Sequence, residues 1–318
     1  MLARTADNLF WTARYMERAD FTARVIDATL RIESLPRGDG AAVGDEWRGA
    51  LAAADAMDAF EGKERIDEAD AIGWLAFDRD NPSSIRSCIE TARANGRAVR
   101  TALTTETWEA LNSAWLEMPK FEAEYVASRG DRGATGRFVE FAKKASLDFD
   151  GSCYRTMLRN DAYWFDRLGL YVERGDNTAR LLDVKYHLLL PGGERIGGSL
   201  DYFQWYSILR AVSAASSFNW LYRRRLEPWL VAEMLVLRPE MPRSLIGCSE
   251  NVLRFLDALS ADYGRQGPAQ RAARAAHDRL RGATIESVFL GGLHEFIAEF
   301  LDGNAALSAA ISAQYLLG

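Results

Sequence analysis

The sequence predicts an all-α protein, and three observations support this fold class. Only eight prolines occur in 318 residues. Ala, Leu, Arg and Glu dominate, and apolar residues recur three or four positions apart, which is the period of an amphipathic helix. No run of alternating β-branched residues lies between turn residues, so nothing in the pattern indicates a β-sheet. We therefore expect helices nearly throughout, arranged as an internally duplicated helical bundle.

The internal duplication rests on two stretches of sequence that each occur twice. Residues 15–27 read YMERADFTARVID and residues 171–183 read YVERGDNTARLLD, with eight identities in thirteen positions and no gap. The pattern P-x-S-[IL]-x-x-C occurs at residues 82–88 and again at residues 242–248. Because the two matches come in the same order, we predict that a whole helical unit was duplicated.

The predicted seam lies near residue 150, between two helical repeats that cover residues 1–150 and residues 151–318. We expect two roughly six-helix halves, related by a pseudo-twofold axis and packed into one compact body. Each half carries one Glu-Arg motif.

Helix periodicity and capping residues predict the elements of both halves. In the first half, helices are expected over about residues 4–33, 45–60, 64–77 and 85–103, then from a cap at Thr104 or Thr105 to the glycine-rich turn at residues 130–136, and from there to about Asp148. In the second half, they are expected from near Ser152 to the loop at residues 191–198, then over about residues 200–214, 218–237, 244–262, 268–281 and 285–300, with a last one to the end.

Composition narrows the class of protein. The net charge of −6 gives no general attraction to nucleic acid or to an anionic membrane, so neither is expected as a partner. Three widely separated cysteines, with no C-x-x-C pair, indicate a reducing compartment. The N-terminal residues have no apolar run of the signal-peptide type, and no stretch approaches the ~20 apolar residues that cross a bilayer. The expected location is cytoplasmic.

The repeated motifs supply the candidate functional residues. Side chains three or four positions apart share one face of a helix, so each motif forms a stripe of acids and arginines. A neighbouring face carries small residues, Ala19 and Ala23 in one copy and Gly175 and Ala179 in the other, which predicts a close helix crossing, for which the two motif helices are natural partners. The candidate site residues are Glu17, Arg18, Asp20, Arg24, Glu173, Arg174, Asp176 and Arg180.

Two interpretations of this acid–arginine stripe are open. In the structural one, the motifs meet near the pseudo-dyad and exchange Glu–Arg pairs in a buried network, because the planar fork of arginine binds a carboxylate at two points. In the functional one, the same groups line a polar cavity that binds a zwitterion or an anion.

A second candidate, for anion binding, is a basic row on the helix that follows residue 84. The alternative is a solvated face paired with Glu90. The row consists of Arg86, Arg93, Arg97 and Arg100.

Other chemistry finds no support in the sequence. None of the three histidines lies in the Glu-x-x-His motif of a helical di-metal site, so no metal site is predicted. No P-loop, dinucleotide fingerprint or G-x-S-x-G elbow is present, so no cofactor and no catalytic residue is assigned. Cys88 and Cys248, at matching positions, are interpreted as small buried apolar residues.

An ordered set of motifs resembles the bacterial alpha-E family, an all-helical family named for its Glu-Arg motif. The motifs are RYMERAD and LYVERGD, together with NPSSI, ARANGRAVR, ETWEALN and MPRSL. The resemblance covers essentially the whole chain and places the named motif on Glu17-Arg18 and Glu173-Arg174. It implies genomic neighbours or fusions of the circularly permuted ATP-grasp class, often with transglutaminase-like proteases. It implies no established reaction, cofactor or catalytic residue.

Three functional hypotheses follow. The leading one is a helical partner or substrate-handling subunit that acts with an ATP-grasp amide ligase on peptides or amino acids. The second is an enzyme that uses Glu17 or Glu173 as a base and Arg18 or Arg174 to hold an amide, carboxylate or acyl-phosphate substrate. The third is a scaffold in which the motifs form a purely structural ion-pair network.

Overall fold

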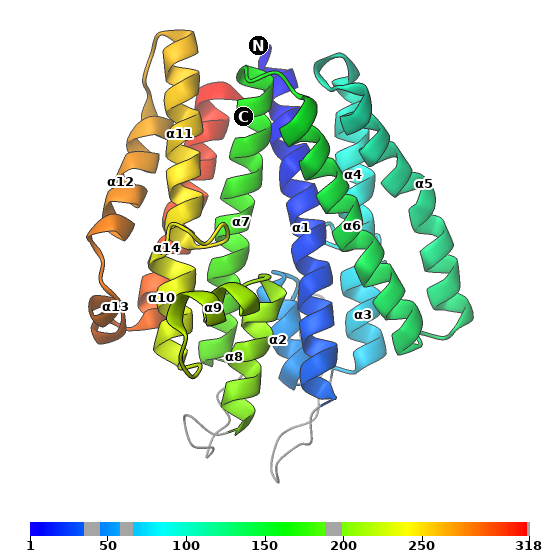
Figure 1. Cartoon of the computed structure of the whole chain (residues 1–318). Helices are drawn as coiled ribbons and strands as arrows, with labels where there is room; N and C mark the ends of the chain where they lie inside the picture. The colour runs from blue at the N-terminus through cyan, green and yellow to red at the C-terminus, as the bar shows by residue number, and fades with distance from the viewer. Residues whose placement is uncertain (35–44, 58–65, 188–198, 317–318) are drawn as a thin grey trace.

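The computed structural model describes residues 1–34, 45–57, 66–187 and 199–316, and these residues form helices and turns without a strand (Figure 1). The all-α prediction is therefore confirmed. The helices before residue 157 are α1 (Ala3–Glu33), α2 (Asp45–Ala53), α3 (Glu68–Ala76), α4 (Ile85–Ala98), α5 (Thr105–Ala127) and α6 (Arg132–Thr156). Those after it are α7 (Asp161–His187), α8 (Ser199–Ala211), α9 (Ala215–Tyr222), α10 (Pro228–Leu237), α11 (Leu245–Tyr263), α12 (Pro268–Gly282), α13 (Ile285–Gly291) and α14 (Leu293–Tyr315).

The two motif helices, α1 and α7, lie side by side at the centre of the molecule (Figure 1). Helices α4 and α6 pack on α1, whereas α11 and α14 pack on α7. Two helices cross between these groups, because α2 packs against α7 and α8 packs against α1. The residues before and after the predicted seam are thus in extensive contact.

Helix α1 is buried on several faces, since α4, α6, α7 and α8 surround it. Its buried side chains include Phe10, Met16 and Ile26, and also the charged residues Glu17 and Asp20. A helix that is enclosed in this way normally buries apolar groups all round. The buried carboxylates on α1 therefore require partners from neighbouring helices.

Helices α1 and α7 approach closely at Gly169, where a Cβ atom would overlap the carbonyl oxygen of Phe10. Packing between the motif helices was expected, but on a different glycine. Gly175, in the small-residue face of the motif, instead lies against Phe300 of α14 and Cys248 of α11. Ala19, the matching residue on α1, is fully buried.

Several expected helix boundaries near the seam are wrong. The glycine-rich residues 130–136 are mostly helical, because the Asp131 carboxylate caps α6 by accepting bonds from the backbone N–H groups of Gly133 (2.9 Å) and Ala134 (3.2 Å). Helix α6 then continues to Thr156, so residue 150 lies inside it. Helix α7 begins at Asp161, nine residues after the expected start.

Two long helices expected in the second half are each divided. The segment 218–237 breaks after Tyr222, where Arg223 adopts a left-handed conformation (φ 49°), and α10 starts at Pro228. The segment 285–300 breaks at Gly292 (φ 93°), and α14 runs on to Tyr315 as one helix. The first break falls in the charged stretch 223–227, just before Pro228, whereas no polar stretch marks the second, at Gly292.

The two Pro-Ser turns have the same local structure. Ser84 accepts a bond from the N–H of Ser87 and caps α4, and Ser244 does the same for α11 through Gly247. Both serines were expected caps or lay at an expected helix start. Helix α4 ends at Ala98 rather than at Leu103, and a short 3₁₀ turn follows it. The expected loops at 36–44 and 191–198 lie outside the described residues.

Candidate functional site

The two Glu-Arg motifs meet where α1 contacts α7, and they exchange partners. Arg174 donates hydrogen bonds from Nε and Nη2 to the two carboxylate oxygens of Glu17, at 3.0 and 2.8 Å. Arg18 donates in the same way to Glu173, at 2.5 and 3.1 Å. Each carboxylate therefore lies in the fork of the arginine from the other motif, the strongest geometry for such a pair. This is the exchange that the structural interpretation predicted.

Each motif carboxylate also receives a second arginine. Arg14 of α1 donates from Nε to Glu173 at 2.7 Å. Arg243, in the turn before α11, donates to Glu17 and also to the Asp20 carboxylate, the latter at 2.8 Å. Both buried carboxylates are thus held by two guanidinium groups.

The second arginines come from positions that do not match in the repeat. The residue that aligns with Arg14 is Leu170, and the residue that aligns with Arg243 is Ser83. The two carboxylates therefore reach the same degree of neutralisation by different means. This difference leaves different amounts of space beside the two pairs.

The ion pairs keep all four motif residues charged. Burial alone would raise the pKa of Glu17, but Arg174 and Arg243 outweigh it and lower that pKa to about 2. Burial would also raise the pKa of Glu173, but Arg18 and Arg14 outweigh this effect and lower that pKa. Because a general base at neutral pH needs a pKa near 7, neither carboxylate is suited to the base role of the enzyme hypothesis.

The remaining motif residues form a second layer of ion pairs. On α1, Arg24 donates to Asp20 at 2.7 Å. On α7, Arg180 donates from Nε to Asp176 at 2.7 Å and from Nη1 to Asp55, beyond the end of α2, at 2.9 Å. The eight candidate residues thus gather around the α1–α7 contact, in two groups that each contain one exchanged pair.

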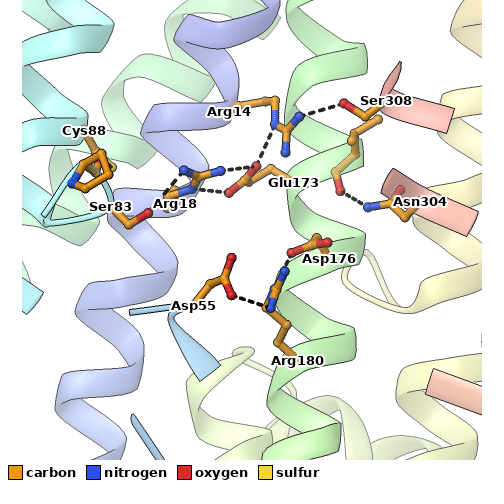
Figure 2. A network of polar contacts seen from close by, with 12 residues as sticks. Arg14, Arg18, Asp55, Ser83, Cys88, Glu173, Asp176, Arg180, Asn304 and Ser308 are labelled. Atoms are coloured by element: carbon orange, nitrogen blue, oxygen red, sulfur yellow. Dashed lines mark hydrogen bonds and ion pairs between the residues drawn. The ribbon is translucent and has the colours of Figure 1, made fainter. Parts of the chain in front are cut away.

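A polar cleft of about 400 Å³ lies beside the Arg18–Glu173 pair, between α1, α7 and α14. Figure 2 shows this region, with the exchanged pair on one side and the Asp55–Arg180–Asp176 cluster on the other. Its volume falls in the range of ~300–1,000 Å³ that is usual for small-molecule sites. The charged residues that line it are Arg14, Arg18, Asp55, Glu173, Asp176 and Arg180.

The cleft lies where the short side chain of Ser83 takes the place of an arginine. At the matching position of the other Pro-Ser turn, Arg243 extends to Glu17 and Asp20. Ser83 lines the cleft, and its hydroxyl oxygen accepts only a long bond of 3.3 Å from Arg18. The cleft thus lies beside the pair whose Pro-Ser turn carries a serine in place of the arginine.

Two buried polar groups in the cleft wall have no hydrogen-bond partner among the described residues. The Nδ2 group of Asn177 is unpaired although the residue is only 4% exposed. The Oγ1 atom of Thr22, a fully buried residue, is also unpaired. Both residues line the cleft. An unsatisfied buried polar group costs about 1–3 kcal/mol. A ligand that forms hydrogen bonds with these two atoms would recover that free energy.

Three of the four arginines of the basic row, on α4 and the turn after it, lie against side chains of α5. Arg86 is buried and pairs with Glu122 of α5. The Arg93 guanidinium lies 4.0 Å from the ring centre of Trp115, and Arg100 lies over Trp108. Of the four arginines only Arg97 is exposed. The row therefore packs α4 against α5, and anion binding there stays a prediction.

Sequence reasoning missed four residues of this site, among them Asp55, which lies outside both motifs. Arg14 lies outside the repeated stretch, so no repeat pointed to it. Arg243 was visible as the one charged residue in the second Pro-Ser match, where the first copy has Ser83. Asn177 replaces Phe21 of the other motif, a change from apolar to polar at an otherwise buried position. The differences between the copies marked the site better than their identities did.

The cysteines contribute no reactive group. Cys88 and Cys248 are buried, as expected, and burial raises the pKa of each thiol to about 12. Among the described residues, no three His, Cys, Asp or Glu side chains gather as potential metal ligands. The described helices also include none with the length and apolarity of a membrane span.

These features define a class: an all-helical protein whose two motif helices are joined by exchanged Glu–Arg pairs beside a polar cleft. The chain belongs to the Alpha-E family, described as a predicted alpha-helical domain with a conserved ER motif, and the match covers residues 1–316. The resemblance inferred from the sequence is thereby confirmed.

Relatives of this chain are known from mycobacteria. It is 25% identical, over 322 aligned residues, to the uncharacterized protein Mb2597 of Mycobacterium bovis and to the uncharacterized proteins MT2643 and Rv2567 of Mycobacterium tuberculosis. The alignments cover 94% of this chain and 35% of each relative. The chain thus spans about a third of the length of these relatives. No solved structure matches it significantly.

Proposed function

We propose that this Alpha-E protein binds a small carboxylate-bearing molecule in the cleft and presents it to an ATP-grasp amide ligase. The observation that carries the proposal is the 400 Å³ cleft, with Arg14 and Arg18 in its wall and the unpaired amide of Asn177 beside them. The planar guanidinium group of arginine is suited to binding a carboxylate. The buried NH₂ group of Asn177 can donate a hydrogen bond to an acceptor on the same ligand.

The structural role of the exchanged pairs does not compete with this proposal. The pairs account for Glu17, Arg18, Glu173 and Arg174 as a buried contact between α1 and α7. They do not account for a polar cleft beside the Arg18–Glu173 pair, nor for unpaired polar atoms in its wall. We therefore assign a structural role to the ion pairs and a ligand-binding role to the cleft.

The ligase partner is inferred from the family resemblance. Circularly permuted ATP-grasp proteins, the implied neighbours of this family, activate a carboxylate for attack by an amine. A helical protein that holds a carboxylate without a base of its own fits the substrate-handling role in such a reaction, and a transglutaminase-like protease is the second partner we propose. Co-expression with the circularly permuted ATP-grasp protein of the same genome tests this part, and failure to co-purify with or without ATP contradicts it.

Binding in the cleft is tested with Ser83→Arg. An arginine at this position is expected to extend towards Glu173 and Asp176, as Arg243 extends to Glu17 and Asp20. It is expected to fill the cleft, and the only contact it removes is the long 3.3 Å bond from Arg18 to the Ser83 hydroxyl. In calorimetry against a panel of carboxylic acids, amino acids and dipeptides, we expect binding by the native protein and none by this variant. If no compound binds the native protein, the proposed function is wrong.

We also infer that the two halves descend from one duplicated unit arranged about a pseudo-twofold axis between α1 and α7. The exchange of Glu–Arg pairs supports this inference, because each motif supplies one carboxylate and one guanidinium group to the other. The matching caps of the two Pro-Ser turns support it as well. The boundary at residue 150 needs revision to the connection between α6 and α7.

A further inference from the structure

The charges that line the cleft are not evenly distributed along it. Arg14 and Arg18 both face the single carboxylate of Glu173, which leaves one positive charge in excess at this end. Glu173 is 2% exposed, so solvent does little to screen that excess. This end of the cleft is suited to a carboxylate.

The other end of the cleft has the opposite balance. Asp176 and Asp55 share the one guanidinium of Arg180, each through a single carboxylate oxygen. Two carboxylates on one arginine leave one negative charge in excess. This end is suited to an ammonium group, which brings three donors and no acceptor.

The wall of the cleft also carries the amide of Asn177, which has no hydrogen-bond partner among the described residues. Along α7, Asn177 comes four residues after Glu173 and three before Arg180. Asp176, the acid of the other end on α7, comes three residues after Glu173 and directly before Asn177. With a rise of about 1.5 Å per residue, Glu173 and Asp176 are about 4.5 Å apart along the helix, so one short ligand can reach both ends. The Nδ2 group of Asn177, only 4% exposed and without a partner, is placed to donate to a carbonyl oxygen midway along a ligand.

We propose that the ligand is a short zwitterion of about dipeptide length, with its carboxylate at Arg14 and Arg18, its amide carbonyl at Asn177 and its ammonium group at Asp55 and Asp176. This inference deepens the proposed function and rests on it. A dipeptide supplies all three groups, because its amide carbonyl is an acceptor separate from its carboxylate. A free α-amino acid has no such carbonyl for Asn177.

The charge balance of the whole cleft also favours a zwitterion over an anion. Its six charged residues are three arginines and three acids, so the lining is neutral overall. A phosphate or a dicarboxylate would leave the acidic end unpaired and repelled. A neutral amide would leave both ends unpaired.

The test uses calorimetry with the dipeptides Ala-Ala, Ala-Glu and Ala-Gln, each free, N-acetylated and C-amidated. We expect at least one free dipeptide to bind, and its acetylated and amidated forms to bind at least about tenfold more weakly. Asp176→Asn should weaken the free dipeptide about tenfold and leave its acetylated form unchanged. Asp27→Asn, on the exposed part of α1, is the matched control and should change neither.

The outcomes separate this inference from the function beneath it. If acetylated dipeptides or simple carboxylic acids bind as tightly as the free dipeptides, the zwitterion is wrong and the carboxylate function stands. If the free dipeptides fail to bind, the inference is overturned. If no carboxylate of any kind binds and Ser83→Arg behaves as the native protein, the proposed function fails with it.

Discussion

Neutralising Glu17 tests the buried ion pairs most directly. Glu17→Gln keeps the shape of the side chain and removes its charge, so Arg174 loses its carboxylate partner and Arg243 keeps only the Asp20 carboxylate. Breaking one partner of a buried ion pair costs about 3–5 kcal/mol. The pKa of Glu17 gives a similar figure, because lowering it from 4.5 to about 2 corresponds to about 3 kcal/mol.

Urea unfolding at pH 7 measures this loss, and thermal unfolding checks it. The entropy of unfolding is about 2.1 cal/mol/K per residue, so a loss of 3–5 kcal/mol lowers the Tm of a 318-residue protein by about 4–8 °C. Asp27→Asn is the control on the same helix, since the Asp27–Arg31 pair is exposed and should contribute less than about 1 kcal/mol. Equal losses in both variants would refute the reasoning.

Three other predictions concern acid, helix packing and the thiols. Since the pKa of Glu17 is lowered to about 2 and that of Glu173 is lowered too, their stabilisation is complete above pH 4.5 and is lost as the pH falls towards 2. Urea midpoints measured from pH 5 to 2 should fall, and by less in Glu17→Gln; unchanged midpoints contradict this. Gly169→Ala should destabilise by about 1–3 kcal/mol through its contact with Phe10, whereas Gly151→Ala, which meets open space on α6, should stabilise by up to about 1 kcal/mol in the same assay. The three buried cysteines should react with a thiol reagent far more slowly in the native than in the urea-unfolded protein, and rapid native labelling would show that at least one is accessible.

The fold class and the pairing of the motifs could be predicted because both depend on periodic or repeated features. The three- and four-residue spacing of apolar groups identified most helices. The repeat predicted that Glu17 and Glu173 would find arginines in the opposite motif, since a buried carboxylate needs a partner and the copies supply one each. Helix ends were harder to predict, because a residue such as Gly292 breaks a helix through its backbone conformation and not through a loss of periodicity.

The cleft could not be predicted, because it depends on where the copies differ and on how side chains fill space. The sequence shows that Ser83 stands where the other copy has Arg243, but it does not show that this difference opens a cavity, because that depends on where the partner helix lies. Gly169 was overlooked for a related reason: its importance lies in the carbonyl oxygen of Phe10, a backbone atom that no sequence pattern identifies. Arg86 and Arg93 were assigned to an open face because the position of α5 was unknown.

The exchange of partners between the motifs also has a consequence for how the protein is made. Glu17 leaves the ribosome 157 residues before Arg174 and 226 residues before Arg243. At about 5–20 residues per second, the first of these arginines follows about 8–30 s later. Until then, the Glu17 carboxylate of α1 lacks the arginines that neutralise it in the folded protein. We therefore expect the nascent N-terminal helices to remain loosely structured and dependent on chaperones until α7 has been synthesised.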